Sequence, residues 1–387
     1  MAYLKFSAEK IFDGYRFLAP GSVLVTEEDG TVSDIINASD AGDGVQLFPG
    51  VLSPGFVNCH CHLELSHMKG VIPTATGLIP FIAAVMKTRH ANDGEIFAAI
   101  EKAEDEMLNN GVVAVGDICN SAITLAQKNK GRMYYHNFIE VSGFNPAVAA
   151  SRFERSVQFF REFGSKYAIP VESNSIVPHA PYSVADELWE MILHFPGNHL
   201  LTIHNQETIE EQHWFMEKTG GFVSFYEQFQ IDTSFFTAPG KSSLQSYLSK
   251  FLRNQSVIFV HNVHSSEEDI LFSKANAKGK HYWCLCPNAN QYISGRLPDI
   301  DLLLKHGCEI VLGTDSLASN HALNILSEIN TVRKDFPHIS LETTLRWATS
   351  NGAKALQLDQ VIGSFEKGKR PGIVSVDEQT GQSQRIL

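Results

Sequence analysis

The sequence predicts an α/β protein with a (β/α)8 TIM barrel and a small β-sandwich that the N- and C-terminal segments form together. Three observations predict this fold. Eight short apolar runs alternate with helical patterns through the middle of the 387-residue chain. Strand-like segments separated by turn residues occupy both ends. No G-x-G-x-x-G turn follows the first apolar run, which disfavours a doubly wound, dinucleotide-binding sheet.

Both ends of the chain have the pattern of a small antiparallel sheet. "SVLVTEEDGTVSDII" places a Glu-Asp-Gly turn between apolar runs, and the tail "GSFEKGKRPGIVSVDEQTGQSQRIL" has the same pattern. We therefore expect residues 1–50 and 356–387 to supply the two parts of the β-sandwich. Residues 51–355 should form the barrel.

The eight runs of the middle segment are expected to be the barrel strands. They are GFVNCHCHLE, VVAVGDICN, YYHNFIEVSG, NSIVPHAPYS, LLTIHNQE, SVIFVHNV, HYWCLCPNAN and EIVLGTDSLAS. Polar residues appear where these runs stop, namely His60, His62, Asp117, Glu140, His179, His204, His261, Asn288 and Asp315. Because the C-terminal ends of barrel strands build one shared pocket, we expect most of these side chains to surround a single site.

Composition narrows the classes of partner. The net charge of −12 disfavours a nucleic-acid partner, whose phosphates the protein would repel. No apolar stretch approaches the length of about 18 residues that spans a bilayer, so no membrane partner is expected. The start, "MAYLKFSAEKIFDG", lacks the pattern of a secretory signal, and the six cysteines read as buried thiols. These features predict a cytoplasmic protein.

The stretch "CHCH" raises the question of a metal site. Successive side chains of a strand point to opposite faces, so His60 and His62 share one face and Cys59 and Cys61 share the other. A zinc finger would instead need its ligands to converge from pairs that are spaced further apart. We therefore expect the histidines to bind a metal inside the barrel and the cysteines to pack outside it.

Other strand ends offer companions for these histidines. His204 and Asp315 each follow an apolar run, and an imidazole set with one carboxylate suits zinc or iron(II). A metal lowers the pKa of bound water to about 7. Glu207 follows His204 by three residues, so its side chain can turn back toward the same pocket and carry protons. Asp315 can accept a proton, and His261 can orient the attacking water.

Four segments together carry a resemblance to a known family. "PGFVNCHCHLE", "HNQE", "VHNV" and "GTDSLAS" resemble the amidohydrolase superfamily, in its cytosine-deaminase-like mononuclear branch. The resemblance implies one divalent metal, zinc in the first place and iron as the alternative, bound by His60, His62, His204 and Asp315. It also implies that Glu207 shuttles protons and that His261 lies beside the hydroxide. It is compatible with a homodimer.

Further segments are similar to deaminases of adenine nucleosides. "PHAPYS" resembles those that act on adenosine, methylthioadenosine and adenosylhomocysteine, and "HLELSH" with "GLIPFI" resembles aminodeoxyfutalosine deaminases of an alternative menaquinone route. The implied reaction replaces the 6-amino group with a 6-oxo group and releases ammonia, with 6-aminodeoxyfutalosine as the first-choice substrate. Guanine, a pterin, an s-triazine or a cyclic amide remains the alternative. A non-catalytic relative is disfavoured, because Glu207, His261 and Asp315 are all present.

Four residues are candidates for binding this substrate. His179 and Glu140 follow strand-like runs and are expected to contact the ring or the ribose. Glu64 lies on a loop after the first strand, where it can accept a hydrogen bond from a ribose hydroxyl. Arg296 is expected to meet an anionic part of the substrate, such as a benzoate.

Overall fold

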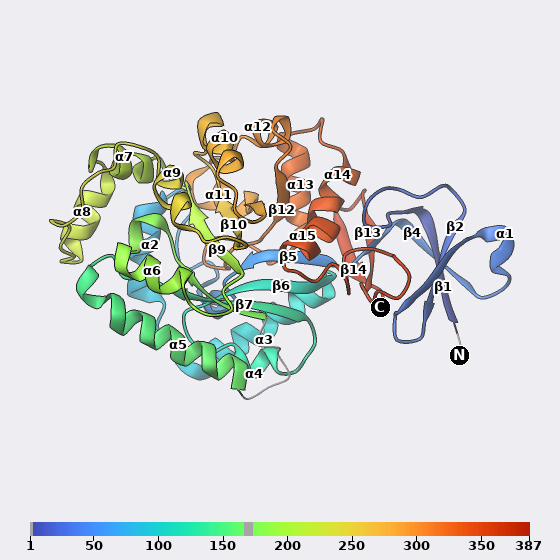
Figure 1. Ribbon diagram of the computed structural model, residues 1–387. Coiled ribbons are helices and arrows are strands. Elements are labelled where there is room, and N and C mark those ends of the chain that lie inside the picture. The colour runs from blue at the N-terminus through green and yellow to red at the C-terminus, as the bar shows by residue number, and fades with distance from the viewer. Residues whose placement is uncertain (1–2, 166–172) are drawn as a thin grey trace.

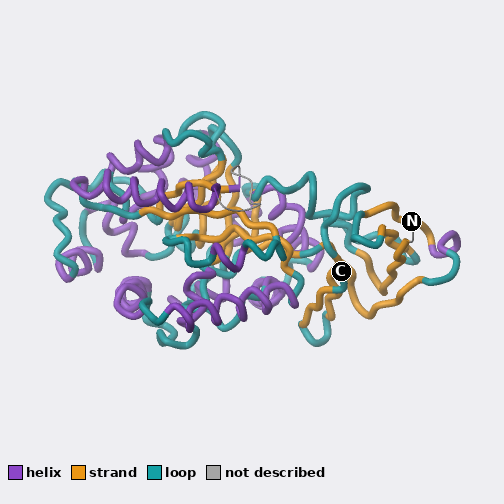
Figure 2. The backbone as a smooth tube through the Cα atoms, turned by 90° about the horizontal axis from the view of Figure 1, so that it is seen from below, coloured by secondary structure: helices purple, strands orange, loops and turns teal. Residues whose placement is uncertain are grey.

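The structure is a computed structural model that describes residues 3–165 and 173–387. Two regions are visible in Figure 1, a barrel surrounded by helices and a sheet that projects from one side of it. Seen from below in Figure 2, both chain ends lie on the side of this sheet. The barrel positions the candidate site, and the sheet holds the segment that leads into it.

Two four-stranded parallel sheets form the barrel wall, in the orders β5-β6-β7-β8 and β12-β11-β10-β9. The strands are β5 (Phe56–Cys61), β6 (Val112–Cys119), β7 (Tyr134–Val141), β8 (Asn174–Pro178), β9 (Leu200–Asn205), β10 (Ser256–His261), β11 (His281–Leu285) and β12 (Glu309–Leu312). Hydrogen bonds join the two sheets at both seams. The amide of His204 donates to the carbonyl of His179 at 3.0 Å, and the amides of Thr314 and Asp315 donate to that of His60, each at 3.0 Å.

These strands coincide with the eight runs expected from the sequence. β5 and β6 are buried along their whole length, as parallel strands covered on both faces should be. The helices between them show one apolar face. In α3 (Asp93–Asn109) the side chain of Asn92 caps the first turn, and Ile96, Ile100 and Met107 are buried. The predicted barrel is therefore confirmed.

Helices cover the barrel and its C-terminal end. In addition to α3 they are η1 (Leu63–Met68), α2 (Leu78–Thr88), α4 (Leu125–Lys128), η2 (Pro146–Val148), α5 (Ala149–Ser165), η4 (Pro181–Ser183), α6 (Asp186–Leu193), α7 (Ile209–Glu217), α8 (Gly221–Gln228), α9 (Ser243–Tyr247), η5 (Leu248–Lys250), α10 (Glu267–Ala275), α11 (Pro287–Ser294), α12 (Ile300–Lys305), α13 (Ile325–Asp335), α14 (Leu341–Arg346), the π-helical η6 (Trp347–Asn351) and α15 (Gly352–Ala355). Within the described residues, none of them is both long and apolar enough to cross a membrane.

Strands from both ends of the chain meet in the projecting region, as the sequence predicts. The expected sandwich takes the form of one continuous six-stranded sheet, in the order β14-β13-β4-β1-β2-β3. Its strands are β1 (Tyr3–Ile11), β2 (Ser22–Glu27), β3 (Val32–Asn37), β4 (Val45–Pro54), β13 (Ile373–Asp377) and β14 (Gln382–Arg385), with the short helix α1 (Ala38–Ala41) after β3. Phe6, Leu24 and Leu52 pack with Phe365 and Ile373 in its apolar core. The predicted domain boundaries after residues 50 and 355 fall within β4 and at the end of α15.

Candidate metal centre and cavity

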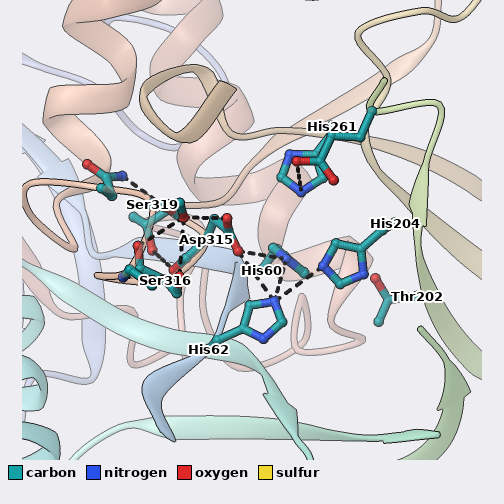
Figure 3. Close-up of polar contacts among 12 residues, drawn as sticks. His60, His62, Thr202, His204, His261, Asp315, Ser316 and Ser319 are labelled. Atoms are coloured by element: carbon teal, nitrogen blue, oxygen red, sulfur yellow. Dashed lines mark hydrogen bonds and ion pairs between the residues drawn. The ribbon is translucent and has the colours of Figure 1, made fainter. Parts of the chain in front are cut away.

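Four ligand atoms converge at the C-terminal end of the barrel (Figure 3). Nε2 of His62 lies 3.2 Å from Nε2 of His60, 3.3 Å from Nε2 of His204 and 3.3 Å from Oδ1 of Asp315. Oδ1 of Asp315 also lies 3.4 Å from Nε2 of His60. One ring proton cannot satisfy three neighbours at once. In a tetrahedral site with bonds of about 2.0–2.1 Å, ligand atoms are about 3.3–3.4 Å apart, so the residues fit one metal ion.

The strand ends explain this convergence. His60 lies on β5, His62 follows the last residue of that strand, and His204 lies on β9. On the opposite face of β5, Sγ of Cys59 lies 3.8 Å from the carbonyl oxygen of Gly352 in α15. Gly313, after β12, permits the close approach of the chain that carries Asp315. A Cβ at Gly313 would lie 2.8 Å from Cβ of His60.

Neighbouring groups orient the ligands. Nδ1 of His204 lies 2.8 Å from the carbonyl oxygen of His179, to which it donates, and this leaves the lone pair of Nε2 for the metal. Ser319 donates to Oδ2 of Asp315 at 2.5 Å, so Oδ1 is the oxygen that faces the histidines. These contacts preform the site for a metal ion.

The protonation states suit a metal ion. Burial is the largest cause that lowers the pKa of the four imidazoles, those of His60, His62, His204 and His261. Neutral imidazoles present a lone pair to a metal. Burial by itself would raise the pKa of Asp315, but His62, His261, His204 and the hydrogen bond from Ser319 together lower it. The carboxylate is therefore available as the anionic ligand.

The backbone is strained at three of the strand ends that carry the site. Asp315, His261 and Asn262 have φ angles of 57°, 74° and 62°, and Gln206, directly before Glu207, has a φ of 47°. Residues other than glycine adopt this left-handed region at an energetic cost, and such strain concentrates at functional sites. The strain turns the loops that carry Glu207 and Asp315 over the barrel mouth.

Glu207 and His261 lie beside the ligands. Oε1 of Glu207 is 3.7 Å from Nε2 of His261, and both side chains are buried. The amide of Asn290 donates to Nδ1 of His261 at 3.0 Å, which places the ring proton on Nε2. Burial, followed by the charges of Asp315 and Glu211, raises the pKa of Glu207 well above its ordinary value. A carboxyl group of this kind can deliver a proton at neutral pH.

A cavity of about 940 Å³ opens above the ligands. His62, His204, Glu207, His261 and Asp315 form its floor. The apolar part of its wall comes from α2, α8 and neighbouring loops, with Leu78, Phe81, Ile82, Val85, Phe144, Phe225 and Tyr226. A volume of this size accommodates a nucleoside with an extension.

Glu64 occupies one side of this cavity. Its Oε1 pairs with Nη2 of Arg89 at 3.0 Å, and its Oε2 accepts from the amide of Asn120 at 3.1 Å and from Oγ of Ser121 at 3.2 Å. Burial raises the pKa of Glu64 to about 7, although Arg89 opposes the shift. The carboxyl group is therefore held in place at the cavity wall.

Glu140 and His179 lie on the other side of His204. Oε1 of Glu140 is 3.6 Å from Nδ1 of His204 and has no hydrogen-bond partner within the described residues. Nδ1 of His179 contacts Oγ of Ser183 at 2.8 Å, and burial lowers the pKa of His179 to about 4. Nδ1 of His204 already donates to a carbonyl, so these three residues are not arranged for a second metal ion. The geometry instead leaves Glu140 and His179 facing the cavity.

Comparison with known proteins identifies the family. The sequence model of the amidohydrolase family matches residues 51–385. The chain belongs to the amidohydrolase family. An adenosine deaminase of Helicobacter pylori is 27% identical over 390 residues, covering 96% of this chain and 93% of the relative. An aminodeoxyfutalosine deaminase of Nitratiruptor is 26% identical and covers 86% of this chain and 80% of its own length. The crystal structure of Helicobacter pylori aminofutalosine deaminase with methylthio-coformycin superposes with a TM-score of 0.82 at 24% identity, over 97% of this chain and 93% of that one.

This amidohydrolase brings most of the candidate residues together, but Asp117, Asn288 and Arg296 do not line the cavity. The four expected ligands, Glu207 and His261 meet at one point, and Glu64, Glu140 and His179 line the cavity above them. Arg296 is exposed on the turn after α11 and does not line this cavity. Its expected role is therefore not supported by its position.

Three other arginines face the cavity of the amidohydrolase. Arg89 lines it beside Glu64, while Arg152 and Arg155 line it from the first turns of α5. No carboxylate of the described residues lies within 4.0 Å of the guanidinium of Arg152 or Arg155. The spacing of three residues in "SRFERS" was the sequence signal for a pair on one helix face.

Proposed function

We propose that this amidohydrolase is a metal-dependent deaminase that hydrolyses the 6-amino group of an adenine nucleoside and releases ammonia. One observation carries the proposal. The four ligand atoms converge at the floor of a deep cavity, directly beside the buried pair of Glu207 and His261. A metal site with a proton-carrying carboxyl group at hand is the arrangement that hydrolysis of an amidine carbon requires.

Glu207, His261 and Asp315 have different roles in the proposed reaction. A divalent metal bound there supplies an activated water molecule at neutral pH. Glu207 delivers a proton to N1 of the adenine ring, which makes C6 more electrophilic. Nε2–H of His261 orients the attacking oxygen. Asp315 accepts one proton of the water and passes it to the amino group, which leaves as ammonia. The second proton of the water returns to Glu207 as the 6-oxo group forms.

The donor set supports zinc as the metal. Three neutral imidazoles and one carboxylate are ligands that zinc accepts, and the separations of 3.2–3.4 Å between the ligand atoms match its bond lengths. Iron(II) tolerates the same ligands and is the second choice.

Two features support a nucleoside with an anionic extension, with 6-aminodeoxyfutalosine as the first choice. Phe81, Phe144 and Phe225 give the cavity an aromatic wall against which a benzoate ring can pack. Arg152 and Arg155 offer guanidinium groups at its exposed side, where the carboxylate of that benzoate can bind. A free base such as guanine would leave both features without a role.

Ammonia release from a substrate panel tests this proposal. The zinc-loaded protein is assayed with adenosine, methylthioadenosine, adenosylhomocysteine, 6-aminodeoxyfutalosine, guanine and cytosine. We expect the highest kcat/KM with 6-aminodeoxyfutalosine and lower values with the other adenine nucleosides. Turnover of guanine or cytosine alone would show that the substrate is a free base rather than a nucleoside. A zinc-loaded protein that releases ammonia from none of the adenine nucleosides would contradict the proposed function.

A further inference from the structure

A buried ion pair lies between the barrel wall and its helices, outside the cavity. Nζ of Lys128, at the end of α4, is 2.5 Å from Oδ2 of Asp117 on β6, and both side chains are fully buried. Lys128 also donates to Oδ1 of Asn137 at 2.7 Å, and its ammonium lies 5.0 Å and 5.1 Å from the ring centres of Tyr135 and Phe163. Neither member of the pair lines the cavity.

The second oxygen of Asp117 reaches the turn that follows the histidine ligands. Oδ1 accepts a hydrogen bond of 2.8 Å from the amide of Leu63, which directly follows His62. The next residue, Glu64, accepts in return from the amide of Asn120, at the end of the strand that carries Asp117. Two carboxyl groups thus tie β6 and η1 together, one from each side.

The ammonium of Lys128 stabilises the buried carboxylate of Asp117. A buried carboxylate without a counterion is strongly unfavourable, whereas a paired one remains charged. A charged acceptor makes a shorter and stronger hydrogen bond than a neutral one. The amide that Asp117 holds lies between a metal ligand, His62, and a cavity residue, Glu64, so its position sets the direction of both side chains.

We propose that Asp117, with Lys128 as its buried counterion, is a positioning residue that holds the turn after the histidine ligands, and thereby holds His62 at the metal and Glu64 at the cavity wall. The pair acts through the amide of Leu63 and contacts neither metal nor substrate. This inference rests on the proposed metal-dependent function for its effect on turnover, but its effect on metal binding can be measured separately.

Two double variants of the full chain distinguish the loss of the hydrogen bond to Leu63 from the loss of the two buried charges. Asp117→Asn with Lys128→Met removes both charges and keeps an oxygen that can accept from Leu63. Asp117→Leu with Lys128→Met is equally neutral and similar in volume but removes this acceptor. The zinc dissociation constant is measured by competition with a chromophoric chelator, at a temperature at which circular dichroism shows both variants folded. KM and kcat are measured on the same preparations.

The variant with asparagine should bind zinc nearly as tightly as the unaltered protein. The variant with leucine should bind zinc about 10–100-fold more weakly, the usual effect of losing a group that orients a metal ligand. It should also have a higher KM, because Glu64 is released. Equal zinc affinity and equal KM in the two variants would overturn the proposal.

Hydrogen exchange in the unaltered protein keeps the proposal testable if the leucine variant does not fold. The amide of Leu63 should exchange as slowly as those of β6, and rapid exchange would contradict the inference. If the unaltered protein binds zinc but deaminates no adenine nucleoside, the proposed function fails. The comparison of zinc affinities still decides whether Asp117 positions the turn.

Discussion

The carboxyl group of Glu207 faces Nε2 of His261 at 3.7 Å, across the ends of the neighbouring strands β9 and β10. Neither side chain has appreciable contact with solvent, with 5% and 1% of the two side chains exposed. The proposed proton donor and the proposed orienting imidazole are therefore both buried side chains at the floor of the cavity. Because burial strengthens electrostatic effects, small changes to either group should have large effects on the rate.

Glu207→Gln should lower kcat at least about 10²-fold, the low end for loss of a general acid or base. The amide keeps the size of the side chain but has no proton to deliver. Zinc content should be unchanged, because Glu207 is not a ligand. Glu217→Gln, at the end of α7, is the matched control and should retain full activity. Full turnover by a zinc-loaded Glu207→Gln protein would place the proton carrier elsewhere.

Asp315→Asn should abolish ammonia release and weaken zinc binding about 10-fold or more. The substitution removes the anionic ligand and the group that takes the proton from water. Zinc content after dialysis and kcat are the measurements. Asp301→Asn is the control, since Asp301 is an exposed carboxylate that pairs with His338 at 2.6 Å. An Asp315→Asn protein with normal kcat would contradict both roles.

Arg152→Met and Arg155→Met should each raise KM for 6-aminodeoxyfutalosine about tenfold, which corresponds to the loss of one charge-assisted hydrogen bond of about 1.5 kcal/mol. KM for adenosine, which has no carboxylate, should change little. Arg161→Met provides the control on the same helix, because Arg161 is exposed and does not line the cavity. Equal increases with both substrates would show that the arginines act on the fold rather than on the carboxylate.

In the metal-free protein, Glu211 should contribute a loss of stability as pH rises from 5 to 8, against the buried histidines, whose lowered pKa values favour folding as pH rises. Burial raises the pKa of Glu211 from 4.5 to about 7, against hydrogen bonds from Ser243 and Gln206. The folded protein therefore binds a proton at Glu211 more strongly than the unfolded chain does. This contribution is fully present below pH 4.5 and is lost as pH rises through about 7.

Between pH 5 and 8, Tm of Glu211→Gln should rise relative to Tm of the unaltered protein. Oε1 of Glu211 accepts from Gln206, whereas Oε2 has no partner within the described residues, so an amide fits the site. Glu101→Gln is the control, because the pair of Glu101 with Lys130 is exposed to solvent. If the difference in Tm between Glu211→Gln and the unaltered protein stays constant between pH 5 and 8, Glu211 does not titrate as described.

The barrel and the ligand set could be predicted from sequence because both depend on regular periodicities. A strand alternates its faces every second residue, which assigns His60 and His62 to the inside from local sequence alone. The rule that the ends of barrel strands share one pocket then brings His204 and Asp315 to the same place. No knowledge of loops was needed for these residues.

The residues of the cavity wall could not be predicted in this way. Arg296 and Arg155 are both arginines in polar surroundings, and only the path of the loops decides which one reaches the cavity. The role of Asp117 depends on a side-chain contact with Leu63, 54 positions earlier in the chain. Contacts of this range follow from tertiary packing and leave no periodic signal in the sequence.

The pairing of β4 with β13 constrains the order in which this protein can mature. Val51 lies opposite Val376 in that pairing, and β4 leads into β5, the strand that carries His60. During synthesis one edge of β4 stays without its neighbour until β13 has left the ribosome. An open strand edge invites contact with other chains. Nascent chains of this protein should therefore depend on chaperones that shield β4, and the histidine strand should gain its final support only after β13 has been synthesised.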